Sequence, residues 1–270
     1  SLYHALNLGS DTGNIFIKLI FGILLIGIIV GGIYRNYYKI KHRKFKCYVK
    51  EIIWETKDTF TLILKSNKKL NFKAGQFCFL RLNKDKLYAR HPFTISSSPE
   101  MEDLHFTIKL NGRFTKAASE LKKGEEVIVD GPFGIFTLDD NKKELVFLAG
   151  GVGITPFMSI IRNQLRSRAE KNILLLYGAR TKEDIIFKDE LDEIKERWLK
   201  KVYVLSRDDY NYEMCEKGYI KKEIIEKYVK NVKNSLFYIC GPEPMKELCK
   251  KELKALGVKS NNIFTESFFW

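Results

Sequence analysis

Three glycines followed by a threonine and a proline form the strongest chemical signal in the sequence. Gly150, Gly151 and Gly153 follow an apolar run of strand length, and Thr155 and Pro156 open a helical pattern. Glycines let a phosphate approach the backbone, and a helix N-terminus offers free N–H groups and positive potential. Thr155 is suited to cap this helix and Pro156 to occupy its first position. The motif predicts a site for a nucleotide pyrophosphate, with a glycine-rich structural turn as the alternative.

Four further segments combine arginine, aromatic residues, glycine and proline. Residues 90–97 read RHPFTISS, residues 112–115 GRFT, residues 131–134 GPFG and residues 240–245 CGPEPM. The glycine motif does not have the G-x-G-x-x-G spacing of an ordinary Rossmann dehydrogenase. Together and in this order, the five segments resemble the ferredoxin–NADP⁺ reductase superfamily, and His-Pro-Phe-Thr resembles its NADPH oxidase and ferric reductase branch. The resemblance covers residues 45–270.

The resemblance implies that the first half of this region binds FAD. Arg90 would pair with the FAD pyrophosphate, because a guanidinium fork matches phosphate oxygens. Pro92, Phe93 and Thr94 would line the isoalloxazine, with the catalytic Thr94 forming a hydrogen bond near flavin N5. His91 is open between a flavin contact and a packed ring. Ile108 and Lys109 would lie along the flavin through their backbone. Gly112 and Thr115 would place a second helix N-terminus at the pyrophosphate.

The second half would bind NADPH or NADH as substrate. Gly151, Gly153 and Thr155, with Gly150 and Pro156 beside them, would hold its pyrophosphate. The nicotinamide would dock at Cys240, Gly241 and Pro242. Cys240 is a candidate catalytic residue, with a buried apolar side chain as the alternative.

Two further expectations concern nucleotide choice and the C-terminus. Ser206 and Arg207 follow a strand, like the residues that grip the 2′-phosphate of NADPH in relatives, and Arg180 is a weaker candidate. This pattern favours NADPH over NADH, and a solvated loop charge is the alternative. The resemblance also implies a C-terminal aromatic ring against the flavin, which is either Phe268 or Trp270.

The pattern of apolar residues predicts two domains behind a membrane segment. Residues 45–130 contain six short strand patterns and one helix pattern at residues 115–124, which predicts a six-stranded antiparallel β-barrel. After residue 141, strands alternate with helices, which predicts an α/β doubly wound parallel sheet. We therefore expect a membrane segment at residues 1–40, an FAD-binding barrel at 41–139 and an NAD(P)H-binding domain at 140–270.

Residues 15–34 read IFIKLIFGILLIGIIVGGIY, a length that crosses a bilayer as a helix. No Lys or Arg precedes the segment and seven follow it by residue 50. The positive-inside rule therefore places the C-terminal domains in the cytoplasm, with the chain anchored once in the cell membrane. A cleaved signal peptide would have a basic leading segment and a shorter apolar core. The glycines of the segment suit packing against another helix, and Ser1 in place of Met predicts a piece of a longer protein.

Composition excludes several other classes. The formal charge of +14 is spread along the chain and is densest after the apolar segment, which favours a lipid surface over nucleic acid. The five cysteines contain no C-x-x-C pair, so we expect no metal site. The four histidines provide no facing pairs on helices for a transmembrane haem. Haem would therefore belong to a partner or to a preceding part of the protein.

The resemblance implies a membrane-bound oxidoreductase that passes hydride from NAD(P)H to FAD and then single electrons to an acceptor. The expected acceptor is haem of a ferric reductase or NADPH oxidase type of membrane domain. Three alternatives stay open: an anchored reductase similar to cytochrome b5 reductase, a flavin electron-transfer subunit that takes no nicotinamide, and an interaction protein with an inactive reductase fold.

Overall fold

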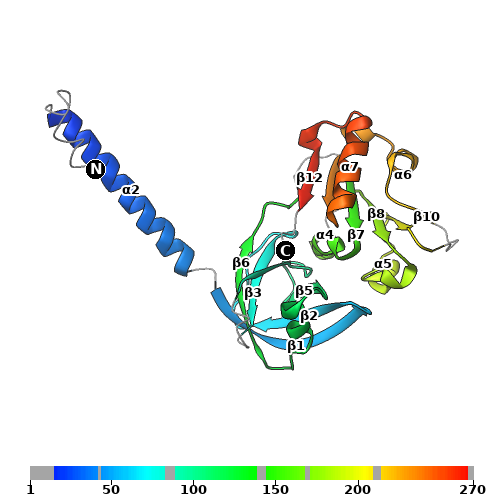
Figure 1. Ribbon diagram of the computed structural model, residues 1–270, viewed down its shortest axis with the longest axis horizontal. Coiled ribbons are helices and arrows are strands. Elements are labelled where there is room, and N and C mark those ends of the chain that lie inside the picture. The colour runs from blue at the N-terminus through cyan, green and yellow to red at the C-terminus, as the bar shows by residue number, and fades with distance from the viewer. Residues whose placement is uncertain are drawn as a thin grey trace. The chain divides into compact units, whose positions relative to one another are not determined.

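The computed structural model of the 270-residue chain describes residues 15–41, 44–82, 89–138, 144–167, 171–208 and 214–266. The chain forms two units, Ser1–Lys44 and Phe45–Trp270. The first contains the long helix α2 and the second contains both sheets (Figure 1).

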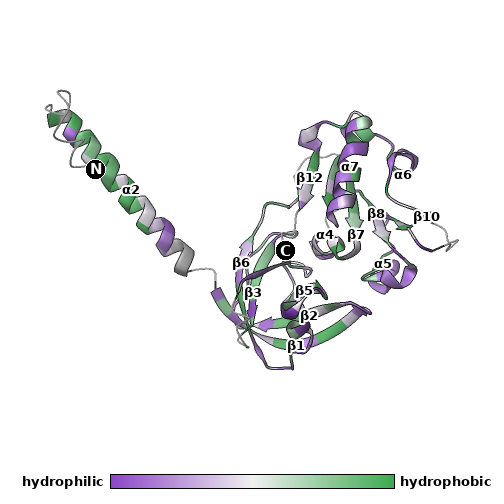
Figure 2. Ribbon diagram, in the orientation of Figure 1, coloured by the Kyte–Doolittle hydropathy of each residue, from purple (hydrophilic) through white to green (hydrophobic). Residues whose placement is uncertain are grey.

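Helix α2 (Ile15–Lys41) carries Lys18 as its only charge up to Tyr34, and its remaining charges lie in residues 35–41. Large side chains such as Ile23 and Ile28 are 68% and 72% exposed, and Figure 2 shows hydrophobic residues along most of the helix. A helix of a globular protein would bury one apolar stripe. Length and composition make Ile17–Tyr37 a candidate membrane span, and signal sequences share both properties. The helix passes its expected end at residue 34 because residues 35–41 contain neither proline nor glycine.

The first sheet has six antiparallel strands in the order β4-β3-β6-β1-β2-β5. Its strands are β1 (Lys44–Thr56), β2 (Thr59–Ser66), β3 (Phe77–Leu82), β4 (His91–Thr94), β5 (Leu104–Lys109) and β6 (Glu126–Phe133). A bridge between Ile95 and Phe106 joins the two ends of the sheet, which curls into a half-barrel. Side chains alternate between core and surface along β3, and the core contains buried residues such as Phe60 and Leu62.

Helix α3 (Arg113–Ser119) is shorter than the expected helix at residues 115–124. It ends where Glu120 leaves helical angles, and the following loop forms a turn in which Glu125 accepts a hydrogen bond from the N–H of Lys122 at 2.7 Å. Gly124 adopts φ +88° and donates its N–H to the carbonyl of Val49 at 2.8 Å. Gly124 therefore aligns the chain with β1 instead of capping a helix.

The second sheet has six parallel strands in the order β10-β9-β8-β7-β11-β12. Its strands are β7 (Leu145–Gly150), β8 (Ile173–Ala179), β9 (Leu199–Leu205), β10 (Cys215–Lys217), β11 (Leu236–Cys240) and β12 (Ile263–Glu266). The antiparallel half-barrel followed by a parallel α/β sheet confirms the two expected domains of the fold class. The three-residue β10 was not expected, because it is too short to show an apolar pattern.

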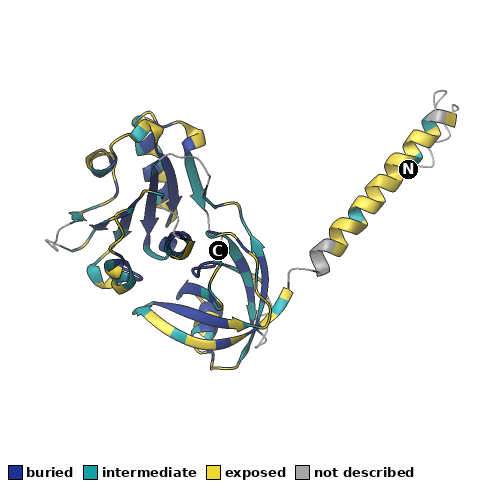
Figure 3. Ribbon diagram, turned by 180° about the vertical axis from the view of Figure 1, so that it is seen from behind, coloured by how far each residue is buried: buried dark blue, intermediate teal, exposed yellow. Residues whose placement is uncertain are grey.

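Helices cover both faces of this sheet. Its helices are α4 (Thr155–Ser167), α5 (Lys188–Glu193), α6 (Lys222–Tyr228) and α7 (Glu243–Ala255). One core contains Phe157 of α4 and Leu191 of α5, and the other contains Ile225 of α6 and Leu253 of α7. The strands are accordingly the most deeply buried part of the domain (Figure 3).

Helix α5 is the main departure from the expected elements of this domain. We expected a helix near residues 187–198, but the helix ends at Glu193. Ile194 takes extended angles and packs into the core with 9% of its surface exposed. The ammonium group of Lys201 donates hydrogen bonds to the carbonyl oxygens of Leu191 and Ile194, so a side chain from β9 satisfies the end of the helix.

Candidate active site

The order in which the chain adds strands to the second sheet reverses between β7 and β11. From β7 the chain passes to β8, β9 and β10 on one side, and β11 and β12 lie on the other. Open α/β sheets bind ligands at the carboxyl ends of strands at such a switch point. Gly150 ends β7 and Cys240 ends β11. The glycine motif and the Cys-Gly-Pro segment therefore meet at the edge where a ligand is expected.

Close packing of the backbone explains two of the glycines at this edge, Gly153 and Gly241, but not Gly151. A Cβ atom on Gly153 would lie 2.3 Å from the carbonyl oxygen of Cys240. A Cβ atom on Gly241 would lie 3.2 Å from Cα of Gly150. Gly151 instead adopts φ +52° and an added Cβ would meet open space. Gly153 and Gly241 therefore bring the strand ends together, and Gly151 leaves room for a ligand.

The start of α4 differs from the sequence expectation. Residues Gly151–Ile154 form a 3₁₀ turn that continues directly into α4. Thr155 has helical angles, φ −55° and ψ −48°, whereas an N-cap residue is extended. The expected capping role of Thr155 is therefore wrong, and Pro156 is the second residue of α4 rather than its first. Both residues are buried.

A cavity of about 230 Å³ opens at the switch point. It lies between the carboxyl ends of β7, β8 and β9, the start of α7 and the β1–β2 hairpin. The predicted site residues that line it are Gly150, Gly151, Arg180, Ser206, Pro242 and Lys109. Five of the eleven residues expected to contact the nucleotide therefore line one cavity, together with Lys109, which was expected at the flavin.

Arg180 and Arg207 come together beside this cavity. The N–H of Arg207 donates to the carbonyl of Arg180 at 2.8 Å, and the N–H of Ser206 donates to the carbonyl of Ala179 at 3.1 Å. Both arginine side chains are exposed. The loops after β8 and β9 thus bring the backbones of two arginines together, and Arg180 lines the cavity.

Sequence reasoning missed two groups of cavity residues. Asp58 and Thr59 reach the cavity from the β1–β2 hairpin of the first domain, and Lys109 pairs with Asp58 at 3.0 Å. Burial raises the pKa of Asp58, but hydrogen bonds from Lys109 and Thr59 outweigh it, so the pKa is lowered. Tyr219 also lines the cavity and is 63% exposed. Tyr219 follows Gly218, which adopts φ +106°.

Thr94 is an unpartnered buried hydroxyl on the barrel side. Its side chain is 4% exposed, and Oγ1 has no hydrogen-bond partner among the residues that the structure describes. Such a group costs about 1–3 kcal/mol unless a ligand or water satisfies it. Thr94 lines a crevice with Pro92, Phe93, Ile108 and Lys109. Val152 and Thr155 line the same crevice. The crevice can therefore offer one hydroxyl to a polar atom of a flat ligand.

His91 is placed outside this crevice. Its ring stacks on Phe114 of α3 with centroids 4.0 Å apart, and Phe93 stacks on the same ring at 5.7 Å. Burial lowers the pKa of His91, which favours the neutral imidazole. The ring is thus packed against Phe114, and the flavin contact of His91 stays a prediction.

Arg90 is held by a carboxylate of the barrel. Its Nη1 lies 3.0 Å from Oδ2 of Asp130, and its guanidinium carbon lies 4.6 Å above the centre of the Phe79 ring. The Arg90 side chain is 49% exposed, so its outer donors remain open to a phosphate oxygen. Asp130 is 3% exposed and thus fixes the arginine from the inside.

Thr115 does not present its hydroxyl to a ligand. Its Oγ1 accepts the N–H of Asn111 at 2.7 Å and donates to the carbonyl of Gly112 at 3.1 Å. This side chain holds the turn that starts α3. Gly112 adopts φ +92°, and an added Cβ would meet open space. A phosphate contact at this turn would therefore use the backbone and not the threonine.

Cys240 is completely buried, with 0% of its surface exposed. Burial raises the pKa of its thiol well above the ordinary value, and Glu266 raises it further. The thiol therefore stays protonated at neutral pH, which leaves packing beneath the ligand edge rather than thiolate chemistry. Phe268 and Trp270, the candidate aromatic partners of the flavin, lie outside the described residues.

Two family models match the chain in chain order. An FAD-binding domain matches residues 41–137 and an oxidoreductase NAD-binding domain matches residues 147–251. The NADH-cytochrome b5 reductase 1 of Dictyostelium discoideum is 31% identical, over 83% of this chain and 82% of that protein. The glycine betaine monooxygenase reductase subunit of Chromohalobacter salexigens is 33% identical, over 81% of this chain and 62% of that protein.

Solved structures show the same fold. A cytochrome P450 reductase from Amycolatopsis has a TM-score of 0.75 at 25% identity and covers 84% of this chain and 70% of its own. A ferredoxin–NADP⁺ reductase from Neisseria gonorrhoeae has a TM-score of 0.73 at 21% identity and covers 85% of this chain and 100% of its own.

The unpartnered Thr94 hydroxyl suits a polar edge of a flavin, and the cavity lies at the switch point, where open α/β sheets bind nucleotides. When bound, FAD supplies the capacity to accept a hydride and release electrons singly. The chain's residues bind the two groups and orient them toward each other. Family models, relatives and site geometry agree that this chain belongs to the ferredoxin–NADP⁺ reductase superfamily and is an NAD(P)H-dependent FAD oxidoreductase.

Proposed function

We propose that this chain is the reductase part of a membrane electron-transfer system and delivers electrons singly to haem in a transmembrane domain. The single observation that carries the proposal is α2, whose described large side chains are mostly exposed and apolar. Such a surface is stable against lipid or against other apolar helices, not in water. Only residues 42 and 43 separate α2 from β1, so a spanning α2 would tether the flavin domain closely.

The charge on either side of α2 supports the same proposal. Residues 1–14 contain no Lys or Arg, and residues 35–50 contain seven. By the positive-inside rule, this asymmetry supports a cytoplasmic position of the two C-terminal domains, where NADPH and NADH are available. The membrane partner remains a proposal that combines the branch resemblance of the His-Pro-Phe-Thr segment with the tether.

We further propose NADPH as the preferred nucleotide. The support is that Arg180 lines the nucleotide cavity and that the backbone N–H of Arg207 donates to the carbonyl of Arg180, with both side chains exposed. Two guanidinium groups can bind the additional phosphate of NADPH, which NADH lacks.

A second candidate is an anchored reductase for a separate acceptor protein. The observation that favours it is the relatives, one of which is named as a reductase of cytochrome b5 and another as a reductase subunit of a monooxygenase. Both candidates use the same nucleotide and flavin sites, so they differ only in where electrons leave.

The deciding experiment uses the full chain in detergent, loaded with FAD under anaerobic conditions. NADPH or NADH reduces the flavin, and the reduced chain is then mixed with soluble cytochrome b5, with a ferric chelate, or with a haem-bearing membrane domain reconstituted in liposomes. Fast oxidation by the membrane domain alone supports the first candidate. Fast oxidation by cytochrome b5 supports the second. Flavin that neither nucleotide reduces would instead favour an electron-transfer subunit.

The membrane assignment has its own measurement. Membranes from cells that produce the chain are washed with alkaline carbonate, which removes peripheral proteins. Retention of the chain, and its release when three apolar residues of α2 such as Leu24, Ile28 and Ile29 are replaced by lysine, supports a spanning helix. Release of the unaltered chain contradicts it.

A further inference from the structure

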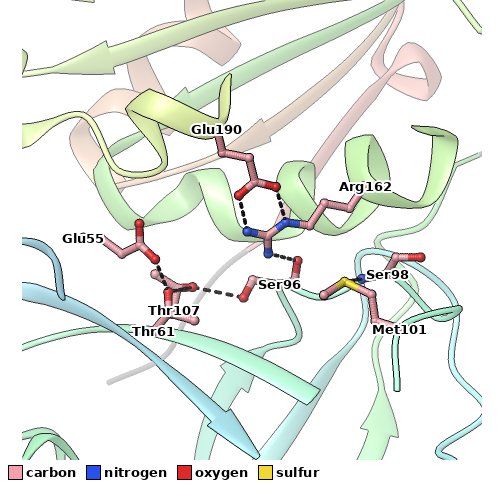
Figure 4. A network of polar contacts seen from close by, with 8 residues as sticks. All are labelled: Glu55, Thr61, Ser96, Ser98, Met101, Thr107, Arg162 and Glu190. Carbon is pink, nitrogen blue, oxygen red and sulfur yellow. Dashed lines mark hydrogen bonds and ion pairs between the residues drawn. The ribbon is translucent and has the colours of Figure 1, made fainter. Parts of the chain in front are cut away.

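A polar network joins α4 of the nucleotide domain to the barrel (Figure 4). Ser159 Oγ donates to the carbonyl oxygen of Ser97 at 2.7 Å, and Arg162 Nη1 donates to the carbonyl oxygen of Ser96 at 2.7 Å. Ser159 and Arg162 lie three residues apart and therefore on one face of the helix. Two consecutive carbonyls of the barrel are thus bound by one turn of a helix of the nucleotide domain.

The guanidinium of Arg162 is fixed on its other side as well. Its Nε and Nη2 donate to the two carboxylate oxygens of Glu190 in α5, the first at 2.7 Å. Its guanidinium carbon lies 4.7 Å from the centre of the Phe187 ring. The Arg162 side chain is 11% exposed. A bidentate pair with both partners in place allows little freedom of orientation, so the donor to Ser96 points in one direction.

Ser96 passes this constraint into the strands of the barrel. Its hydroxyl lies 3.0 Å from Oγ1 of Thr107, which lies 2.8 Å from Oγ1 of Thr61. Thr61 donates in turn to Glu55 at 2.5 Å. Thr107 is a wall residue of the flavin crevice, and Ser96 follows Thr94 by two residues. The carbonyl that Arg162 binds therefore belongs to the segment that carries the unpartnered Thr94 hydroxyl.

The start of α4 lines the same crevice. Val152 of the 3₁₀ turn and Thr155 of α4 line it together with Pro92, Phe93 and Thr94 of the barrel. Thr155, Ser159 and Arg162 follow an i, i+4, i+7 spacing, which places them along one face of α4. One face of one helix thus contributes a wall residue at its first turn and two bonds to the flavin segment on the next two turns.

We propose that Arg162, supported by Ser159, is a positioning residue that sets the distance between the flavin and the nicotinamide. The inference rests on transfer of hydride from NAD(P)H to FAD, the activity assigned above. In that step the C–H bond at nicotinamide C4 breaks and the hydride is added to flavin N5, so the electron pair moves with the hydrogen. Such a step depends steeply on separation, and a displacement of 1 Å costs about 100-fold in rate.

The test measures flavin reduction in a single turnover with the full chain, loaded with FAD, under anaerobic conditions and saturating nucleotide. The variants are Arg162→Ala, Arg162→Lys and Ser159→Ala. Arg166→Ala is the matched control, because Arg166 lies one turn further along α4, lines the same surface cavity as Arg162 and is exposed.

Arg162→Ala is expected to lower the reduction rate about 100-fold, with FAD and nucleotide dissociation constants within about twofold of the unaltered chain. The long-wavelength charge-transfer absorption of the nicotinamide–flavin complex should weaken. Deuterium at nicotinamide C4 should give a full primary kinetic isotope effect on the reduction rate. Arg162→Lys should recover part of the rate because one charged donor remains. Ser159→Ala should lower the rate less than Arg162→Ala, and Arg166→Ala should not change it.

Three results would overturn the inference. The first is a folded Arg162→Ala chain whose reduction rate is within threefold of the unaltered chain. The second is a rate that falls only in proportion to lost flavin, which would show a stability role alone. If Arg162→Ala does not fold, Ser159→Ala decides, and an unchanged rate and charge-transfer band in that variant is the third. Failure of the unaltered chain to reduce its flavin would contradict the assigned activity, which separates the two claims.

Discussion

The two walls of the active site recognise their ligands by different means. The barrel wall presents side chains, with the buried hydroxyl of Thr94 directed to a crevice. The nucleotide wall presents backbone, where Gly153 and Gly241 allow two strand ends to touch and Gly151 leaves space. A buried group that needs a partner favours a ligand that stays bound, and an open backbone surface favours one that exchanges. This difference suits a resident flavin and a nucleotide substrate.

The largest expected effect comes from a substitution that disrupts the packed backbone of the nucleotide wall. Gly153→Ala places a Cβ atom 2.3 Å from the carbonyl oxygen of Cys240, and neither backbone segment can move without disturbing β7 and β11. We expect a loss of about 3 kcal/mol in unfolding free energy, the upper end of overpacking costs, and loss of nucleotide binding. Thermal unfolding and nucleotide titration measure both.

The control for this prediction is Gly151→Ala. An added Cβ there meets open space, so only the strain of φ +52° remains, about 1–2 kcal/mol. Equal losses in the two variants would contradict the role assigned to close packing at Gly153.

A second prediction concerns the loss of stability in acid. It involves the barrel and not the nucleotide domain, because all four histidines precede residue 106. Burial lowers the pKa of His105 from 6.5 to about 4. The unfolded chain therefore binds a proton below pH 6.5 that the folded chain refuses, so stability present above pH 6.5 is lost as pH falls toward 4. The loss is on the order of 3 kcal/mol.

Denaturant unfolding between pH 7 and pH 4 measures this loss, with His105→Gln as the comparison. The pKa of Glu55 is raised by burial and opposes the effect, so the difference between the two chains isolates the histidine. Parallel pH curves for the two chains would contradict the prediction.

A third prediction tests whether the Thr94 hydroxyl binds the flavin or is only a buried group that destabilises the chain. Thr94→Val removes a buried oxygen that lacks a partner among the described residues and keeps the shape of the side chain. The chain without FAD should be as stable as the unaltered chain or more stable. FAD affinity should fall about tenfold, the value of one hydrogen bond of about 1.4 kcal/mol. Fluorescence titration with FAD measures the affinity, and unchanged binding would show that Thr94 does not contact the flavin.

The smallest expected effect concerns the choice between NADPH and NADH at the nucleotide wall. Arg207→Ala should lower the preference for NADPH over NADH about tenfold, because it removes one charge-assisted contact to the additional phosphate. The ratio of kcat/KM for the two nucleotides measures the preference. Arg197→Ala is the matched control, because Arg197 is also exposed but precedes β9 at the opposite end of the sheet. A preference that both substitutions leave unchanged contradicts the NADPH proposal.

The sequence predicted what short-range patterns determine. Alternating apolar residues located the barrel strands, and the glycine motif located the switch point, because both depend on neighbouring residues. Sequence reasoning missed contacts between distant segments. Nothing near Gly153 in the sequence shows that the carbonyl of Cys240 lies against it. The same holds for Thr115, whose suitable hydroxyl is used by the turn of Asn111.

Helix ends were also hard to predict for a long-range reason. Lys201 ends α5 through a bond from another strand, which no local pattern around residue 194 reveals. Tyr219 and Asp58 reach the nucleotide cavity from a loop and from the other domain, so their spacing in the sequence carried no signal.

The β1–β2 hairpin limits how freely the two domains can be exchanged. Asp58, Thr59 and Lys109 belong to the barrel, yet they line the nucleotide cavity. A chimera that receives the nucleotide domain of a relative would inherit only part of the recognition surface. Selection for a new nucleotide would therefore act on both halves of the gene, and coupled substitutions in the hairpin and in the loops after β8 and β9 should appear together.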